Sequence, residues 1–444
     1  MKSATRILDK QTVDANDHVT NAQLIKRRKT ENSESVCSDL AGTTVEEPGV
    51  AATQLLTNGV LFDRMVSTPI YFISNGLQKV RPYWFTHRTY AKRRWLNRTL
   101  DDVFPNEFRR LKACYVAQAI RLGRIRVNGE VISKQYRLKD NDLITHRFHR
   151  HERPVLDARV KILAETDDVL VVDKPCSMPV HPCGSYHYNS VLNVLRHQQN
   201  YDHLRVVHRL DRTTSGCLMF ARNLRTDQTL SRQFREREIQ KEYLARVTGE
   251  FPDDNEIVCA QSVCALSAQL GVHQTVGDDA GKPAVTRFRR VWTDTRTSVV
   301  RCSPETGRTH QIRVHLQYLG YPIDNDYIYN TDAFGASRGK HGDYGGRTRE
   351  QLIAAVAAEH DAQQWVADND GELGEPRWAA VDEAHEQAAL LKVTDDYDPF
   401  CADCHVTKID PTGDLLRMHL HCLRYWTNEW QYESEWPSWA VQPK

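Results

Sequence analysis

One carboxylate of this chain stands between two arginines, in the run VHRLDRTTSG from Val207 to Gly216. Asp211 follows Arg209 by two residues and directly precedes Arg212. Guanidinium charge at this distance lowers the pKa of a carboxylate, so we expect Asp211 to be ionised at neutral pH. An ionised carboxylate can act as a nucleophile or stabilise a developing positive charge. A bare Arg-Leu-Asp, however, is more typical of a salt bridge at the end of a strand. The residues around it must therefore distinguish a catalytic carboxylate from a structural one.

The longer string HRLDRTTSG closely resembles the active-site motif of the RluA-type pseudouridine synthases. Three more strings resemble motifs of this family and occur in the family's order: VVDKPCSMPVHP at 171–182, KEYLARVTGE at 241–250 and TGRTHQIRVHLQYLGYPI at 306–323. Tyr321 stands where the family usually has His. The flanking strings RPYWFTHRTYAKRRW and CADCHVTKIDPTGDLLRMHLHCLRYW resemble the eukaryotic branch, which includes the anticodon-stem-loop tRNA pseudouridine synthases.

The resemblance implies an isomerase that acts on uridine in RNA. Such an enzyme breaks the N-glycosidic bond, rotates the freed uracil and rejoins it to the ribose through carbon. It flips the target base out of its stack, because stacking screens the anomeric carbon. Asp211 is implied as the essential carboxylate, acting at or beside that carbon either as nucleophile or as base; the sequence leaves both open. The resemblance also implies that no cofactor is needed.

The other site residues follow from the same motifs. Tyr243, in Lys-x-Tyr, is expected to stack on the flipped uracil, with a proton transfer as a second role. Arg313 is expected to pair with Asp211 and keep it ionised, and Arg308 competes for that role. Substrate contacts are expected from Arg209, which would fill the space left by the flipped base, and from His208, Lys241 and Arg308. His310 and His315 are interpreted as structural residues.

Charge is unevenly distributed, although the whole chain carries a formal +1. The segment 79–153 holds 19 Lys/Arg against 7 Asp/Glu, which indicates either a surface for a polyanion such as nucleic acid or a solvated basic face; charge alone leaves both open. Within it, Asn106–Leu122 predicts a helix ending at Gly123, and Arg124–Ile132 predicts a hairpin with an Asn-Gly turn. This pattern resembles a small RNA-binding module first described in a ribosomal small-subunit protein. The arginines expected to face RNA are Arg109, Arg110, Arg124 and Arg126.

The fold class expected is α+β, with a mixed, mostly antiparallel sheet as the catalytic core and the helix-hairpin module before it. Buried-strand patterns lie at 169–172, 218–221 and 297–302, and Ile312, Val314 and Leu316 are interpreted as alternating core positions of a further strand. Residues 331–400 hold 6 Lys/Arg against 15 Asp/Glu and are interpreted as an insertion with a helix at 350–366. The domains expected are a disordered tail at 1–75, the basic segment at 76–155, the catalytic domain at 156–330, the partly disordered acidic insertion at 331–399 and a strand region completing the catalytic domain at 400–444.

Cofactor and metal motifs are weak. Neither G-x-G-x-x-G nor a P-loop lysine occurs, so no nucleotide cofactor is expected. Eleven cysteines lack a disulfide framework and are expected to be reduced. The pair Cys401 and Cys404 raises a zinc site with His405, His419, His421 and Cys422 as candidate ligands. Because HLHCLRY itself resembles the family's closing strand, the prediction is that no metal is bound, and a deaminase is excluded for want of an H-x-E partner.

Partners and compartment complete the expectations. No run approaches 18 apolar residues and the mean hydropathy is −0.59, so no membrane partner is expected. The beginning of the sequence has no apolar segment of a secretory signal, and Lys26–Lys29 (KRRK) is of the nuclear-import type, so nucleus or cytoplasm is expected, with the mitochondrion as the alternative. The predicted partner is RNA, above all tRNA with mRNA as the second choice, and the chain is expected to act as a monomer. The rival functions are a catalytically silent RNA-binding scaffold and an rRNA-directed synthase.

Overall fold

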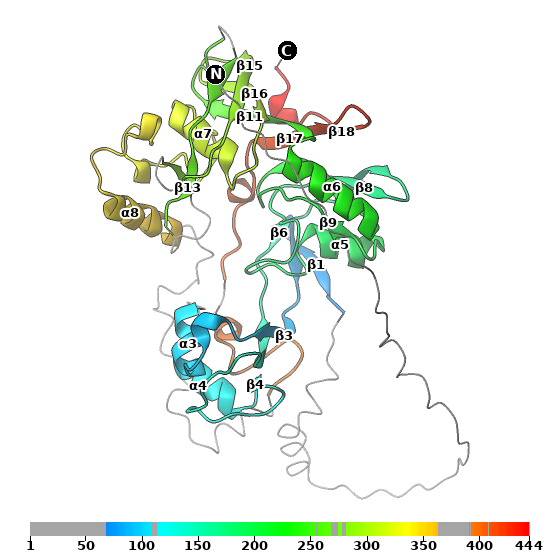
Figure 1. Ribbon diagram of the computed structural model, residues 1–444, viewed down its shortest axis with the longest axis vertical. Coiled ribbons are helices and arrows are strands. Elements are labelled where there is room, and N and C mark those ends of the chain that lie inside the picture. The colour runs from blue at the N-terminus through cyan, green and yellow to red at the C-terminus, as the bar shows by residue number, and fades with distance from the viewer. Residues whose placement is uncertain are drawn as a thin grey trace, which may run out of the picture. The chain divides into compact units, whose positions relative to one another are not determined.

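A ten-stranded sheet organises most of the chain in this computed structural model, which describes residues 68–107, 113–253, 256–267, 274–277, 281–362, 390, 392–406 and 408–443. Its main path runs β12 (Ile257–Cys259), β15 (Thr286–Thr293), β16 (Thr297–Pro304), β11 (Gln240–Thr248), β17 (Leu420–Trp426), β10 (Ser215–Ala221), β8 (Val169–Lys174) and β7 (Lys161–Glu165), with β18 (Gln431–Glu433) beside β17 and β9 (Arg205–Val206) beside β10 (Figure 1). The pairs are antiparallel except for β10 with β17. The predicted mixed, mostly antiparallel α+β core is confirmed.

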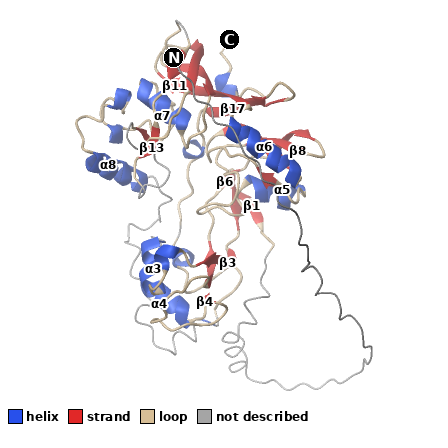
Figure 2. Cartoon of the chain, in the orientation of Figure 1, coloured by secondary structure: helices blue, strands red, loops and turns tan. Residues whose placement is uncertain are grey.

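Three smaller sheets and a few helices complete the described chain. The sheets are β1 (Tyr71–Ser74), β2 (Leu77–Val80) and β6 (Val155–Leu156); β3 (Tyr83–Tyr90), β5 (Leu143–Arg150) and β4 (Ile125–Val127); and β13 (Val263–Ala265) with β14 (Gln274–Val276). The helices are α3 (Leu100–Glu107), α4 (Ala113–Arg121), α5 (Val191–Gln199), α6 (Leu224–Glu236), α7 (Gln311–Leu319) and α8 (Arg349–Ala362) (Figure 2). In the described part of the chain no helix has the length and apolar character needed to cross a bilayer.

Strand β10 is an interior strand of the ten-stranded sheet, and its sequence is apolar on both faces. Cys217, Leu218, Met219 and Phe220 are all fully buried, as expected of a strand covered on both sides. Its neighbours are β8 from earlier in the chain and β17 from near the end of the chain. Strand β17 also pairs with β11, so residues 420–426 join two parts of the sheet (Figure 1).

The basic segment folds differently from the predicted helix and hairpin. The predicted helix at 106–122 overlaps the end of α3 and all of α4, which ends two residues before Gly123, and residues 108–112 lie outside the described structure. The Asn-Gly turn forms, but only the single bridge Val127–Glu130 follows it. The second predicted strand at 131–132 is absent from these described residues, and β4 pairs with β5.

Two domain boundaries are also corrected. Strand β1 begins at Tyr71, inside the predicted disordered tail, while the KRRK cluster lies outside the described residues. The start of the predicted insertion is packed, because Phe334, Leu352 and Val356 share an apolar cluster with Val314 of α7. Helix α8, at Arg349–Ala362, forms where a helix was expected at 350–366. Residues 363–389 lie outside the described structure.

The strand expected around Ile312 is wrong, since this run forms the first turns of α7. The core positions themselves are confirmed: Ile312, Val314 and Leu316 are all buried. Gln311, Arg313, His315 and Gln317 are buried as well, so every face of the helix is covered. A helix covered on all sides lacks the polar stripe that marks a helical period, and its alternating apolar residues were therefore mistaken for a strand.

Gly216 should tolerate no side chain, because β10 and β17 approach closely at this residue. A Cβ atom there would lie 2.2 Å from the Cys422 carbonyl oxygen, and φ is +107°. We expect Gly216→Ala to lower the free energy of unfolding by well over the roughly 1–2 kcal/mol that a positive φ costs alone. Gly346→Ala, at φ +70° with open space around it, is the matched control. Equal losses in urea unfolding would contradict the close approach.

Candidate active site

Asp211 lies in the turn that leads into β10. The Thr214 N–H donates to the Asp211 carbonyl at 3.2 Å, which closes the turn directly before Ser215 begins the strand. Lys174, at the end of β8, fixes the same turn from below: its Nζ donates to the carbonyls of Arg212 at 3.0 Å and Met178 at 2.7 Å. Burial lowers the pKa of Lys174 to about 7. The hydrogen bonds of Lys174 Nζ to this turn give Lys174 a positioning role next to Asp211.

Arg313 of α7 reaches toward Asp211 from a buried ion pair. Its Nε and one terminal nitrogen donate to the two oxygens of Asp326 at 2.6 and 2.8 Å, and its other terminal nitrogen lies 3.5 Å from Asp211 Oδ2. Asp326 Oδ1 also accepts the N–H groups of Ile328 and Tyr329. The side chains of Asp326 and Arg313 are 1% and 3% exposed, whereas that of Asp211 is 21% exposed. Of the two carboxylates on Arg313, only Asp211 is therefore accessible to a substrate.

His310 approaches Asp211 from a second side. Its Nε2 lies 3.6 Å from Asp211 Oδ2, and its Nδ1 lies 2.8 Å from the Tyr329 hydroxyl. That hydroxyl also accepts the Gln274 N–H at 2.9 Å. Nε2 is therefore the ring nitrogen that faces the carboxylate, and a proton on it stabilises the ionised form of Asp211. A residue expected to be only structural thus directly neighbours Asp211.

The surroundings keep Asp211 ionised. Burial alone would raise the pKa of its carboxyl, but His310, Arg313 and Arg209 outweigh burial and lower the pKa from its ordinary value of 3.8. A lowered folded-state pKa contributes stability that is complete above the ordinary value and is lost as the pH falls through the folded value. At neutral pH the site therefore presents a negatively charged oxygen beside two basic side chains.

Tyr243 stands on β11 at a bulge in its pairing with β17. The register shifts between Glu242 and Tyr243, and such a bulge redirects the side chain that follows it. Its hydroxyl lies 3.1 Å from that of Tyr425, whose oxygen is 3.4 Å from His208 Nδ1. Burial, above all, raises the pKa of Tyr243 well above its ordinary value. At neutral pH Tyr243 is therefore a neutral phenol, and its hydroxyl is held by the contact with the Tyr425 hydroxyl.

His208 supports this tyrosine pair. Its Nε2 accepts the Met219 N–H at 3.0 Å, so the proton of the neutral ring sits on Nδ1 and faces Tyr425. Burial, followed by the charge of Lys241, lowers the pKa of His208 to about 3, so the ring is neutral. Both ring nitrogens are thus engaged within the protein, and the substrate contact of His208 stays a prediction.

The remaining predicted substrate contacts differ in their surroundings. Arg308 donates from Nε to the Pro283 carbonyl at 3.1 Å, so Arg313 rather than Arg308 is the arginine placed beside Asp211. Lys241 Nζ lies next to Gly307, where an added Cβ would be 3.1 Å away. Burial lowers the pKa of Lys241. Arg209 is exposed, so it is free to move toward a bound substrate.

Among the arginines of the basic segment, Arg124 contradicts the prediction. It is 4% exposed and donates to both oxygens of Asp398 at 2.7 and 2.9 Å, because a buried guanidinium needs a carboxylate partner. Arg126 is half-buried and donates to the carbonyls of Gly123 and Gly129 around the Asn-Gly turn. Arg109 and Arg110 lie outside the described residues.

Sequence reasoning missed Asp326, Tyr329 and Tyr425. Asp326 follows the third motif by three residues, in DNDYIYN, and an acidic residue so close to a motif that contains Arg313 was the available signal. Tyr329 carries no such signal, since its role depends on contacts with both His310 and the Arg313 guanidinium, whose carbon lies 4.9 Å from its ring centre. Tyr425 was visible only as part of the string HLHCLRY.

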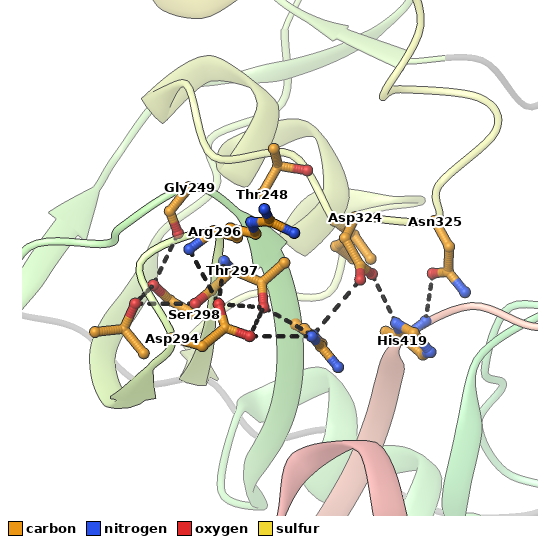
Figure 3. Close-up of polar contacts among 12 residues, drawn as sticks. Thr248, Gly249, Asp294, Arg296, Thr297, Ser298, Asp324, Asn325 and His419 are labelled. Carbon is orange, nitrogen blue, oxygen red and sulfur yellow. Dashed lines mark hydrogen bonds and ion pairs between the residues drawn. The ribbon is translucent and has the colours of Figure 1, made fainter. Parts of the chain in front are cut away.

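We expect Asp326→Ala to destabilise the protein by about 3–5 kcal/mol, because it leaves the Arg313 charge buried with a single distant partner. Asp324→Ala is the matched control two residues away. Asp324 contacts His419 (Figure 3) at 2.7 Å, and its carboxylate lies 3.7 Å from Arg246. The Asp324 side chain is partly exposed, so the loss of its pairs should cost clearly less than the loss of the fully buried pair. Urea unfolding measures both; similar small losses would contradict the importance of the buried pair.

The comparisons with known proteins agree with this arrangement. The profile of the family described as RNA pseudouridylate synthase matches residues 168–318. A mouse protein named Pseudouridylate synthase RPUSD2 is 40% identical over 418 residues, which cover 86% of this chain and 75% of the mouse protein. Two proteins of Saccharomyces cerevisiae also match: the tRNA pseudouridine(32) synthase, mitochondrial, is 34% identical, with 83% of this chain and 78% of that protein covered. The tRNA pseudouridine(31) synthase is 30% identical, with 83% and 96% covered. The motifs around Asp211, the mixed sheet that presents them and these relatives together show that the chain belongs to the RNA pseudouridine synthase family of isomerases.

Proposed function

We propose that this chain isomerises uridine to pseudouridine in tRNA, with Asp211 as the essential group and without a cofactor. The observation that carries the proposal is the accessible carboxylate of Asp211, which is kept ionised beside the buried Arg313 and His310. The two relatives named tRNA pseudouridine synthases support tRNA as the substrate.

Asp211 would act on the ribose of the flipped nucleotide. As a nucleophile it would form a bond to the anomeric carbon while the N-glycosidic bond breaks and its electron pair leaves with uracil. As a base it would remove a ribose proton beside that carbon as the same bond breaks.

On the first route uracil turns and its carbon bonds to the anomeric carbon while the bond to Asp211 breaks and the carboxylate is restored. On the second route the electron pair left by the removed proton forms a double bond in the ribose; uracil turns, its carbon bonds to the anomeric carbon, and the neighbouring ribose carbon takes back a proton. On both routes the proton on the bonded uracil carbon is then lost, and the released ring nitrogen takes up a proton. Either route requires an ionised carboxylate, and the neighbouring cations supply that state.

Tyr243 would contribute its ring rather than a proton transfer. A phenol whose pKa is raised by burial is a poor base at neutral pH. The ring face offers a stacking surface for the freed uracil, and the contact between the Tyr243 and Tyr425 hydroxyls would hold it at a constant angle. Arg209, exposed and two residues before Asp211, would occupy the position of the flipped base.

The basic segment would bind the RNA away from the reacting base. Helices α3 and α4 and the sheet β3-β5-β4 carry it, and the segment 79–153 has 19 basic against 7 acidic residues. Lysine and arginine contacts to phosphates give affinity without sequence specificity. An mRNA or an rRNA substrate would use the same contacts, so mapping pseudouridine in each class of RNA with and without this protein distinguishes them.

We further propose that the chain acts as a monomer and that it works in the nucleus or cytoplasm; the KRRK cluster at 26–29, which is of the nuclear-import type, supports the nucleus. One yeast relative is named as mitochondrial, which makes the mitochondrion the alternative compartment. A fluorescent fusion of the full chain, compared with one in which the cluster is neutralised, tests the compartment.

Asp211→Asn should abolish pseudouridine formation on tRNA while fold and RNA affinity stay close to wild type. The amide preserves the shape but carries no charge and is no nucleophile. Pseudouridine in tRNA is measured by mass spectrometry after single-turnover incubation. Asp324→Asn is the control, since the Asp324 side chain is also 21% exposed and pairs with cations but does not neighbour Asp211 in these contacts.

Residual turnover above about a tenth of wild type would refute the role of Asp211, because one decade corresponds to only about 1.4 kcal/mol of barrier. If the wild-type protein itself forms no pseudouridine on any RNA class yet binds RNA tightly, the rival function as an RNA-binding scaffold is supported instead.

Replacing Arg109, Arg110 and Arg126 together with Gln should weaken RNA binding and flatten its salt dependence. Each lost phosphate contact on a single strand removes about 0.7 from the slope of log K against log salt, so the triple variant should lose roughly two units. Single-turnover rates at saturating RNA should stay near wild type.

Arg124→Gln is the informative comparison for this titration. Because Arg124 is buried against Asp398, its loss should lower the free energy of unfolding and leave the salt slope unchanged. An unchanged slope in the triple variant would mean that these arginines do not contact RNA.

A further inference from the structure

The cysteine pair of the C-terminal region does not meet the neighbouring histidines that its sequence suggested. His419 Nδ1 lies 2.7 Å from Asp324, and His421 lies between the hydroxyls of Ser215 and Ser434, at 2.9 Å from each. Cys422 is buried in the core on β17. These candidate ligands are therefore engaged elsewhere.

Cys401 and Cys404 meet two histidines from the basic segment instead. His149 is the penultimate residue of β5, and His151 follows that strand by one residue. Cys404 lies 253 residues from His151 and 255 from His149 in the sequence, so the fold alone brings them together. The ligand atoms of all four side chains lie within 4.8 Å of one another.

The spacing of these atoms fits a tetrahedral ion. His149 Nδ1 and His151 Nε2 are 3.2 Å apart, and Cys404 Sγ lies 3.1 Å from the first and 3.3 Å from the second. Zinc bonds of about 2.3 Å to sulfur and about 2.0–2.1 Å to nitrogen place tetrahedral ligand atoms roughly 3.3–3.8 Å apart. A shift of a few tenths of an ångström would fit an ion between these atoms.

Two contacts orient the ligand atoms from outside the cluster. His149 Nε2 lies 3.1 Å from the Asp395 carbonyl, so its ring proton is on Nε2 and the Nδ1 lone pair faces the cluster. The Asp398 N–H donates to Cys404 Sγ at 3.3 Å, the kind of hydrogen bond that stabilises a thiolate. A carbonyl partner on the second ring nitrogen is the common support of a metal-ligating histidine.

We propose that His149, His151, Cys401 and Cys404 bind one structural zinc ion. Two thiolates and two imidazoles form a closed donor set of the kind that binds zinc in structural sites and leaves no position for a substrate. The ion would fasten the segment 394–404 to strand β5. That segment already contacts the basic region through Asp398 with Arg124 and through the Thr394 carbonyl with the Trp84 indole.

An ion can also reach the site. His151 and Cys404 both line a pocket, so two of the ligands are open to it. The proposal is independent of the reaction at Asp211, because the described contacts of the four ligands do not include the residues of that site.

The full chain, produced without a histidine tag in zinc-supplemented cells, should contain about one zinc per chain by elemental analysis. Removal of zinc with a chelator under reducing conditions, followed by Co²⁺, should give the visible bands of tetrahedral cobalt and a thiolate charge-transfer band. Added Zn²⁺ should abolish these bands, because zinc binds such a site more tightly than cobalt.

Cys404→Ser and His151→Gln should each lose most of the zinc, with affinity falling by more than the roughly 10–100-fold typical of losing an outer-shell partner. The matched controls are Cys183→Ser, an exposed cysteine, and His405→Gln, the residue next to Cys404 that lies outside the cluster. Both controls should keep the full zinc content. Circular dichroism shows which variants remain folded.

The wild-type measurements decide the proposal even if a ligand variant fails to fold. Absence of zinc from the wild-type chain together with absence of cobalt bands would overturn it. So would a Cys401–Cys404 disulfide found by mass spectrometry after alkylation, or a folded Cys404→Ser variant that binds zinc as well as wild type does.

Discussion

The candidate active site depends on the buried ion pair between Arg313 and Asp326. A guanidinium that is 3% exposed must be neutralised, and Asp326 does so with two hydrogen bonds while it also accepts two backbone N–H groups. Arg313 is thereby held with one terminal nitrogen directed at Asp211. Because the pair is satisfied without Asp211, the second carboxylate can stay accessible while the nearby guanidinium still lowers its pKa. Burial thus separates the roles of the two carboxylates: the buried Asp326 neutralises Arg313, and the accessible Asp211 faces the substrate side.

The two sides of the site are built by different principles. On the side of Asp211, charges control a protonation state, and Lys174 and His310 support the turn and the carboxylate. On the side of Tyr243, burial suppresses ionisation, and the chain of hydroxyl and imidazole contacts through Tyr425 to His208 fixes an aromatic ring. A reaction that needs an ionised oxygen next to a neutral stacking surface requires both environments a short distance apart, and two strands that flank β17 provide them.

Several features could be predicted from the sequence because they are carried by contiguous strings. The turn at Asp211, the buried run of β10 and the mixed sheet belong to this group. Features that depend on distant partners could not. Nothing in the spacing of the basic segment shows that Arg124 points at Asp398, 274 residues later, while Arg126 stays at a turn. Helix α7 was mistaken for a strand because it is covered on all faces. The histidines that face Cys401 and Cys404 could be found only after β5 was placed beside them.

The position of β17 has a consequence for synthesis of the protein on the ribosome. Residues 420–426 form β17, which lies between β10 and β11. Asp211 lies in the turn before β10, and Tyr243 lies on β11. Until residues 420–426 leave the exit tunnel, both older strands expose an unpaired edge, and β10 is apolar from Cys217 to Ala221. Synthesis proceeds at about 5–20 residues per second, and roughly 200 residues separate β10 from β17, so β10 waits about 10 seconds or more for this neighbour. The nascent chain is therefore exposed to edge-to-edge association during this interval, and the two sides of the candidate site are joined only when β17 is in place.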